Sequence, residues 1–184
     1  MSYPTTVAEL LELYLAKGDQ AYGEEVTSLE HALQCAAVAR GAGASDELIA
    51  AALLHDVGHL VADVQGNERY DLSQDDDIHE AIGARVLSPI FGAAVAQPVS
   101  LHVTAKRWRC TVEPGYLERL SATSRATLQA QGGLLNDAQC ERFQNHPGFA
   151  AAVTLREWDD QGKIPDQEIP ALASYTELLE KLVR

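Results

Sequence analysis

Residues 51–60, with the sequence AALLHDVGHL, place three polar side chains in an otherwise apolar segment: His55, Asp56 and His59. A carboxylate among alanines and leucines is costly to bury unless it is paired, protonated or bound to a metal. Because a carboxylate has two oxygens, Asp56 could bind two neighbouring cations at once. On a continuous helix, His55 and Asp56 would lie about 100° apart and flank one point beside the helix. His59 would lie one turn beyond His55, on the same face.

Five of the six histidines could join Asp56 in a single site. The histidines come from four predicted helices and are His31, His55, His59, His79 and His102. A second carboxylate, Asp159 in the motif LREWDD, comes from a fifth predicted helix. Taken singly, each histidine is more often an ordinary polar residue than a ligand. Together, imidazoles and carboxylates without thiolates favour iron or manganese over a structural zinc. Such a site would leave coordination positions open for substrate and for oxygen or water.

The segments that must position these residues all show helical patterns. Apolar residues recur at helical spacing, with capping residues at several starts and glycine or proline near several ends. The sequence predicts helices over residues 6–17, 25–41, 46–63, 78–90, 98–107, a segment opened by Pro114, 121–133, 137–143, 147–159 and about 173–183. No alternating strand pattern or internal repeat is present. The predicted fold class is therefore all-α, with residues 1–184 forming a single domain.

Composition limits the class of protein and of partner. The chain has 184 residues, 46% of them hydrophobic, which suits one compact core. A formal net charge of −13 disfavours nucleic acid and anionic membranes as partners. There is no run of eighteen apolar residues, and the first residues do not resemble a secretory signal. The cysteines Cys35, Cys110 and Cys140 form no CxxC motif, so a reduced, cytoplasmic protein is predicted.

The order of the ligand candidates resembles a known helical superfamily. The pattern H…HD…D, through His31, His55, Asp56 and Asp159, resembles the HD-domain superfamily, and His79 and His102 resemble the additional ligands of its dinuclear members. Five segments between residues 20 and 165 are similar to one branch, the HD-domain oxygenases that cleave organophosphonates: YGEEVTSLEHALQCA, LLHDVGHL, HVTAKRW, LSATSRATLQAQGG and LREWDD. The resemblance implies an all-α HD-domain helical bundle with its site core at about 20–165.

The resemblance also implies a cofactor, namely two Fe ions in the mixed-valent Fe(II)/Fe(III) state. One iron would be bound by His31, His55, Asp56 and Asp159. The second would share Asp56 as a bridge and also be bound by His79 and His102.

Further positions match the part of the family that binds substrate. The resemblance assigns the phosphonate to His59, Lys106, Ser124 and Arg156. Lys106 lies in the basic stretch AKRWR, which by position alone is typical of a solvated helix end. An anionic substrate, however, needs local positive charge even in an acidic protein.

A loop with tyrosine and glutamate covers the site in this family, and Tyr22 and Glu24 correspond to it here. The carboxylate would contact the amine of the substrate, and the tyrosine would occupy an iron position until substrate arrives. Asp56, His59 and Tyr22 would thus be the catalytic residues. Tyr22 lies one position away from the tyrosine of the family pattern. The resemblance therefore allows either a primary amine or a trimethylammonium group on the substrate. For the latter, Tyr22, Trp108 and Tyr116 are candidate members of an aromatic cage.

The activity implied by the resemblance is a dioxygenase reaction. It would use O2 to cleave the C–P bond of a 1-hydroxy-2-(amino or trimethylammonio)ethylphosphonate, releasing phosphate and glycine or glycine betaine. A metal-dependent HD-type phosphohydrolase acting on a phosphate ester or nucleotide is the alternative, because bound metals could also activate water. A non-catalytic metal-binding protein is a third possibility. The oligomeric state stays open.

Overall fold

The computed structural model describes residues 3–20, 25–64 and 78–184, and for residues 62–64 it describes the backbone alone. Tyr22 and Glu24 lie outside the described residues. Within the described ranges every regular element is a helix, which confirms the predicted all-α class. None of these helices is both long enough and apolar enough to cross a bilayer.

The described part of the chain contains eleven α-helices and one 3-10 helix. In chain order they are α1 (Val7–Lys17), α2 (Ser28–Gly41), α3 (Asp46–Leu54), α4 (Val57–Val64), α5 (His79–Phe91), α6 (Ala93–Val112), α7 (Tyr116–Arg119), α8 (Ala122–Ala130), α9 (Asp137–Gln144), α10 (Phe149–Gln161), the 3-10 helix η1 (Leu172–Tyr175) and α11 (Thr176–Lys181). The C-terminal segment predicted as one helix over 173–183 is thus a 3-10 turn followed by a short α-helix.

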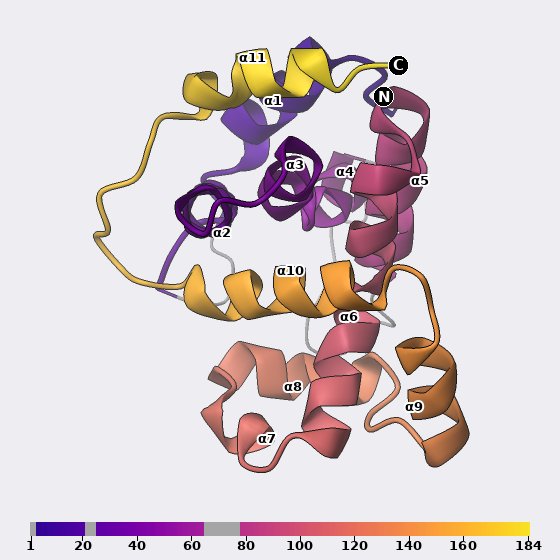
Figure 1. Ribbon diagram of the computed structural model, residues 1–184. Helices are drawn as coiled ribbons and strands as arrows, with labels where there is room; N and C mark the ends of the chain where they lie inside the picture. The colour runs from indigo at the N-terminus through magenta and orange to yellow at the C-terminus, as the bar shows by residue number, and fades with distance from the viewer. Residues whose placement is uncertain (1–2, 21–24, 65–77) are drawn as a thin grey trace.

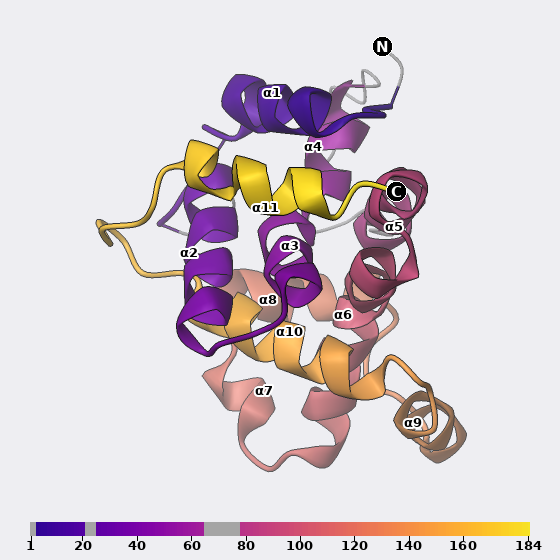
Figure 2. The ribbon, with the colours of Figure 1, turned by 45° about the horizontal axis from the view of Figure 1, so that its top comes forward.

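The bundle is organised around α3 and α6. Helix α6 packs against α5, α10 and α3, while α2 packs against α3 and α10. Helices α1 and α11 cover one end of the bundle, and α7, α8 and α9 lie at the opposite end (Figures 1 and 2). Residues 50–54 of α3 are fully buried in the centre of the apolar core. The core therefore surrounds the segment that leads directly into His55 and Asp56.

The N-terminus of α2 is fixed by a capping box. The Thr27 side chain accepts a hydrogen bond from the backbone N–H of Glu30, and the Glu30 carboxylate accepts one from the backbone N–H of Thr27. Two otherwise unpaired backbone donors are satisfied in this way. The cap places His31 in the first full turn of the helix, on the side that faces the core.

The predicted helix over residues 46–63 is wrong in one respect: it is interrupted at His55 and Asp56. Helix α3 ends at Leu54 and α4 begins at Val57. At the break, the backbone N–H of His59 bonds to the carbonyl of Asp56. The apolar pattern continues across the interruption, so periodicity could not reveal it. As a result, His55 follows directly after the last residue of α3, whereas His59 belongs to α4.

The predicted start of a helix at Pro98 is also wrong. Helix α6 begins five residues earlier, at Ala93, and Pro98 lies inside it. Proline in a helix removes one backbone hydrogen bond. Here the extensive packing of α6 against three neighbouring helices outweighs that loss, and the first turns carry the fully buried Val95 and Val99. Proline was therefore a weaker boundary signal than the burial of the flanking residues.

Gly58 sets the distance between α4 and α5. A Cβ atom at this position would lie 1.9 Å from the backbone carbonyl oxygen of His79. Since His79 is the first residue of α5, the missing side chain allows this residue to approach the turn that carries Asp56.

We expect Gly58→Ala to lower the free energy of unfolding by about 1–3 kcal/mol, because the overpacked backbone must move. The matched control is Gly41→Ala, where a Cβ would meet nothing within 4 Å and alanine should be neutral or slightly stabilising. Urea unfolding of both variants measures the difference. Equal stability of the two variants would contradict the proposed role of Gly58.

Candidate metal centre

Six side chains from separate parts of the chain converge between α2, α5, α6 and α10. Each residue is at most 7% exposed: His31, His55, Asp56, His79, His102 and Asp159. They are the six residues that the family resemblance implies as metal ligands. The structure therefore brings the whole predicted set together in the interior of the bundle.

The two oxygens of Asp56 face two different pairs of imidazoles. Its Oδ2 lies 3.3 Å from Nε2 of His55 and 3.6 Å from Nε2 of His31. Its Oδ1 lies 3.3 Å from Nε2 of His79 and 3.6 Å from Nε2 of His102. Asp56 is thus placed as a carboxylate between two potential cation sites.

Asp159 lies beside only one of the two pairs. Its Oδ1 is 3.4 Å from Nε2 of His31, and its Oδ2 is 3.9 Å from Nε2 of His55. One candidate cation position is therefore surrounded by two imidazoles and two carboxylates. The other is surrounded by only two imidazoles and Oδ1 of Asp56, which leaves more positions for exogenous ligands.

The backbone fixes which imidazole nitrogen faces Asp56. Three of the rings use Nδ1 to donate a hydrogen bond to a carbonyl oxygen: His31 to Gly162 (2.8 Å), His55 to Ala52 (2.9 Å) and His102 to Val99 (2.7 Å). In a neutral ring this leaves a lone pair on Nε2. The Nε2 atoms of His31 and His55 lie only 3.2 Å apart, beside carboxylate oxygens. Such a set of facing acceptors fits a bound metal cation.

Metal binding requires ionised carboxylates and neutral imidazoles. The two carboxylates and His102 meet this condition, whereas the pKa of His55 is raised, because the charges of Asp56 and Asp159 outweigh the effect of burial. Burial tends to raise the pKa of Asp56, but His55 and His79 outweigh this effect and hold it well below its usual value. Burial acts likewise on Asp159, whose pKa is nevertheless held well below its usual value, chiefly by Arg156. Burial and the neighbouring imidazoles lower the pKa of His102 to about 3.

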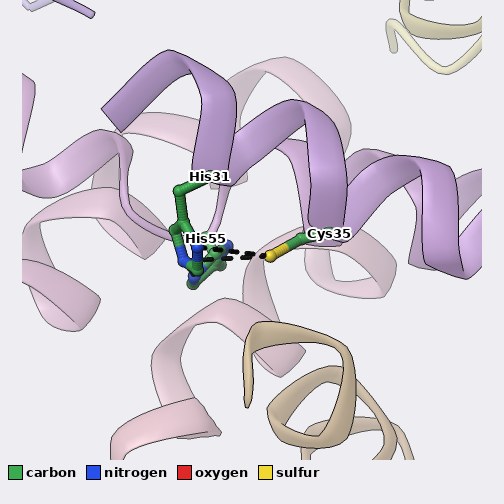
Figure 3. A group of neighbouring side chains, drawn as sticks. All are labelled: His31, Cys35 and His55. Atoms are coloured by element: carbon green, nitrogen blue, oxygen red, sulfur yellow. Dashed lines mark hydrogen bonds between the residues drawn. The ribbon is translucent and has the colours of Figure 1, made fainter. Parts of the chain in front are cut away.

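Cys35 lies beside this centre without the character of a ligand. Its Sγ is 3.8 Å from both ring nitrogens of His31, so the sulfur sits against the ring (Figure 3). Burial, followed by the charges of Asp159 and Asp56, raises the pKa of the thiol well above its usual value. A protonated thiol is a poor ligand, since metals bind the thiolate. This agrees with the predicted donor set of nitrogen and oxygen atoms.

A cavity of about 40 Å³ opens next to the Asp56 side of the centre. Asp56, His79 and His102 line one part of it. All four described residues predicted to bind phosphonate line it as well: His59, Lys106, Ser124 and Arg156. The ring of His59 stacks on that of His79 with a centroid distance of 3.9 Å. The cavity thus joins the candidate metal site to a cationic pocket.

Lys106 is buried, so the alternative that AKRWR is only a solvated helix end is wrong for this residue. It is 3% exposed, and its Nζ donates hydrogen bonds to Thr127 Oγ1 at 3.0 Å and to the carbonyl of Ser124 at 3.4 Å. Burial, with the nearby charge of Arg156, lowers its pKa to about 7. Because of burial and of this second cation, the charge of Lys106 changes with pH near neutrality.

Arg156 is held rigidly by three partners. Its Nη1 donates to Asp159 at 2.7 Å, its Nε donates to the hydroxyl of Tyr116 at 3.0 Å, and its Nη2 contacts Asp160. The Tyr116 hydroxyl itself donates to Asp160 at 2.5 Å. Asp160 is thus part of the support of Arg156, whereas its neighbour Asp159 faces the histidines.

The two described aromatic residues proposed for a cage do not line the cavity. Trp108 packs against Phe143 and Phe149, with centroid distances of 6.2 and 4.9 Å. Tyr116 contributes its hydroxyl to the Arg156 network. These positions assign both rings to structural packing and support.

Comparison with known proteins agrees with this geometry. The HD domain model matches residues 28–132. The chain is 43% identical to hydroxymethylphosphonate dioxygenase of Gimesia maris, over 92% of this chain and 84% of that protein. It is 35% identical to the glycine-betaine-forming [1-hydroxy-2-(trimethylamino)ethyl]phosphonate dioxygenase of Leisingera caerulea, over 91% and 85% of the two chains. The chain belongs to the HD-domain organophosphonate dioxygenase family. Membership implies metal binding and supports a dioxygenase activity.

Four polar residues that line the cavity of this HD-domain dioxygenase were missed by the sequence reasoning: Thr123, Thr127, Gln131 and Lys163. Thr127 accepts a hydrogen bond from Lys106, and Lys163 lines the cavity beside Ser124. Lys163 follows Asp159 by four residues, the spacing of one helical turn, which was the available signal. It was missed because the predicted helix ended at residue 159.

We expect Asp56→Ala to abolish metal binding at both candidate positions of this HD-domain dioxygenase, because each of the two Asp56 oxygens faces one of them. The measurement is the iron content per chain after reconstitution and desalting. Glu157→Ala is the control, since Glu157 is an exposed carboxylate on the same helix as Asp159. Unchanged iron in Asp56→Ala would contradict a bridging carboxylate.

Proposed function

We propose that this chain uses O2 at a two-iron centre to cleave the C–P bond of a small 1-hydroxyphosphonate. The observation that carries the proposal is the two-sided environment of Asp56, which adjoins a pocket lined by Lys106 and Arg156. The first feature suits a pair of metal ions, and the second suits an anionic substrate. The two dioxygenase relatives favour this combination over a hydrolase.

The donor set fits iron, as nitrogen and oxygen ligands without thiolate suit redox-active non-haem sites. His31, His55 and Asp159 would hold one ion, and His79 and His102 the other, with Asp56 shared by both. When bound, a mixed-valent iron pair would supply the activation of O2 and of the substrate hydroxyl.

The residues of the chain would bind and orient the phosphonate. Lys106 and Arg156 provide charge-assisted donors, and Ser124 provides a hydroxyl at the same end of the cavity. With the phosphonate held there, the adjacent hydroxyl-bearing carbon would point towards Asp56. His59 lines the same space and would contribute a ring nitrogen to the substrate, with its orientation fixed by stacking on His79.

The described part of the cavity favours a substrate with a small substituent. No phenyl, phenol or indole ring lines the cavity among the residues that the structure describes. An aromatic cage for a quaternary ammonium would require such rings. Because Tyr22 and Glu24 lie outside those residues, their predicted contacts with an amine stay predictions. We therefore place hydroxymethylphosphonate first among the candidates, followed by the 2-amino and 2-trimethylammonio compounds.

The proposed reaction consumes one O2 for each C–P bond that is broken. With hydroxymethylphosphonate, the carbon would be oxidised to formate, and both oxygen atoms of O2 would end in formate and phosphate. With the two larger substrates, the carboxylate product would be glycine or glycine betaine.

We expect the iron-loaded protein to consume O2 and release phosphate in a 1:1 ratio when it is mixed with hydroxymethylphosphonate. Parallel assays with the 2-amino and 2-trimethylammonio substrates rank the substituents by kcat/KM. An oxygen electrode and a phosphate assay on the same sample provide the ratio. Phosphate release from phosphate esters without O2 uptake would instead support the phosphohydrolase alternative.

We also expect anion affinity to fall as the pH rises through about 7, because Lys106 is positively charged only below its lowered pKa. Above that pKa the affinity would fall by at most tenfold per pH unit, and bound anion would shift the fall to higher pH. Methanesulfonate suits the test, since its own charge is constant. Its dissociation constant is measured on the iron-loaded protein without O2.

Lys106→Arg is the control for this pH dependence, since arginine stays charged throughout the range. The variant should lose the fall in affinity that Lys106 causes. If Lys106→Arg showed the same decline as the unaltered protein, another group would be responsible.

A further inference from the structure

We propose that Lys163 is a third cation of the phosphonate pocket and that it fixes the hydroxyl of Ser124 as a donor to the anion. The assignment rests on the proposed function, because it names a further contact of the same substrate. It concerns a residue just beyond the end of α10, outside the set that the sequence pattern identified.

Lys163 lies between the candidate metal centre and the anion pocket. Its Nζ is 2.9 Å from Oγ of Ser124 and 3.6 Å from Oδ1 of Asp159. Its side chain is 12% exposed and lines the cavity. A lysine in this position adds charge where the substrate anion and the carboxylate ligand would meet.

The contact with Lys163 determines the direction of the Ser124 hydroxyl. An ammonium group can only donate hydrogen bonds, so Oγ of Ser124 must be the acceptor of this bond. The Ser124 hydroxyl can then donate its proton in another direction, towards the cavity that Ser124 lines. On its other side, the carbonyl of Ser124 accepts a hydrogen bond from Lys106. Ser124 is therefore held between two lysines.

The backbone around Lys163 is fixed to α2 on both sides. The Gln34 amide donates to the carbonyl of Ile164 at 2.8 Å and accepts from its N–H at 2.9 Å. The carbonyl of Gly162 accepts the Nδ1–H of His31 at 2.8 Å. These bonds flank Lys163, so its backbone position is coupled directly to that of a candidate metal ligand.

The close approach of this segment to α2 depends on Gly162. A Cβ atom at Gly162 would lie 2.4 Å from Sγ of Cys35. Only a residue without a side chain allows the carbonyl to reach His31 at this distance. The segment therefore has little freedom to carry Lys163 away from Ser124.

A third cation strengthens the positive charge of the pocket. Arg156 contacts Asp159 and Asp160, and Lys163 also lies 3.6 Å from Asp159, so these carboxylates compensate part of the charge of both cations. Lys106 has a pKa of about 7, so burial removes part of its charge near neutral pH. A phosphonate with up to two negative charges is therefore better matched when Lys163 contributes as well.

The direct test is the affinity of Lys163→Met for methylphosphonate, a non-reacting probe, on the iron-loaded protein without O2. We expect the dissociation constant to rise about 10- to 100-fold, the range for loss of a charged hydrogen bond. Iron content should be unchanged, and Lys163→Arg should restore part of the affinity. Lys181→Met is the matched control, because Lys181 is exposed and pairs with Glu177 on the surface.

A double-mutant cycle with Ser124→Ala tests the coupling between the two residues. If Lys163 orients the Ser124 hydroxyl, the double variant should lose less affinity than the sum of the two single losses. Strictly additive losses would contradict this part of the proposal. Unchanged methylphosphonate affinity in Lys163→Met, or loss of iron in that variant, would overturn the substrate contact itself.

Failure of the Lys163 assignment can be distinguished from failure of the proposed function, because the methylphosphonate binding assay involves no turnover. A protein that binds methylphosphonate through Lys163 but consumes no O2 with any of the 1-hydroxyphosphonates would overturn the dioxygenase substrate proposal. It would leave the assignment of Lys163 to an anion pocket intact.

Discussion

The contact between one buried carboxylate and two pairs of imidazoles is the constraint on which the rest of the structure depends. Asp56 lies where α3 ends and α4 begins, so both of its oxygens reach into the bundle. A negative charge in this apolar interior is stable only with compensating positive charge. The histidines, the backbone carbonyls that orient them and the close approach at Gly58 place metal-binding nitrogen atoms around that carboxylate, where a bound cation would compensate its charge.

Helical periodicity was sufficient to predict the all-α fold. The histidines within apolar helices indicated a site, and the resemblance of the motifs to the HD-domain oxygenases selected the six convergent side chains. It could not predict the interruption at His55 and Asp56, since the apolar pattern runs through it. It also misplaced the start of α6, where burial of Val95 outweighs the proline signal. Lys163 was missed because it lies beyond the predicted end of the helix that carries Asp159, in a segment that the hydrogen bonds of Gln34 hold in place.

The protein combines a net charge of −13 with a cationic pocket, and the structure explains how both coexist. Lys106 and Arg156 are buried at the cavity, where each has polar partners inside the bundle. Their charges are thereby focused on a small space instead of being spread over the surface. Membership in the dioxygenase family gives this arrangement a chemical meaning: a phosphonate bound in the pocket would lie beside the carboxylate that would bind the metals.

The most direct measurement is a crystal structure of the iron-loaded protein with anomalous diffraction recorded at the iron edge. The account predicts two iron peaks on opposite sides of the Asp56 carboxylate, roughly 3.5–4 Å apart, as in other two-metal sites. Each oxygen of Asp56 would be bonded to a different iron. A single iron peak, or two peaks that do not share Asp56, would contradict the central claim.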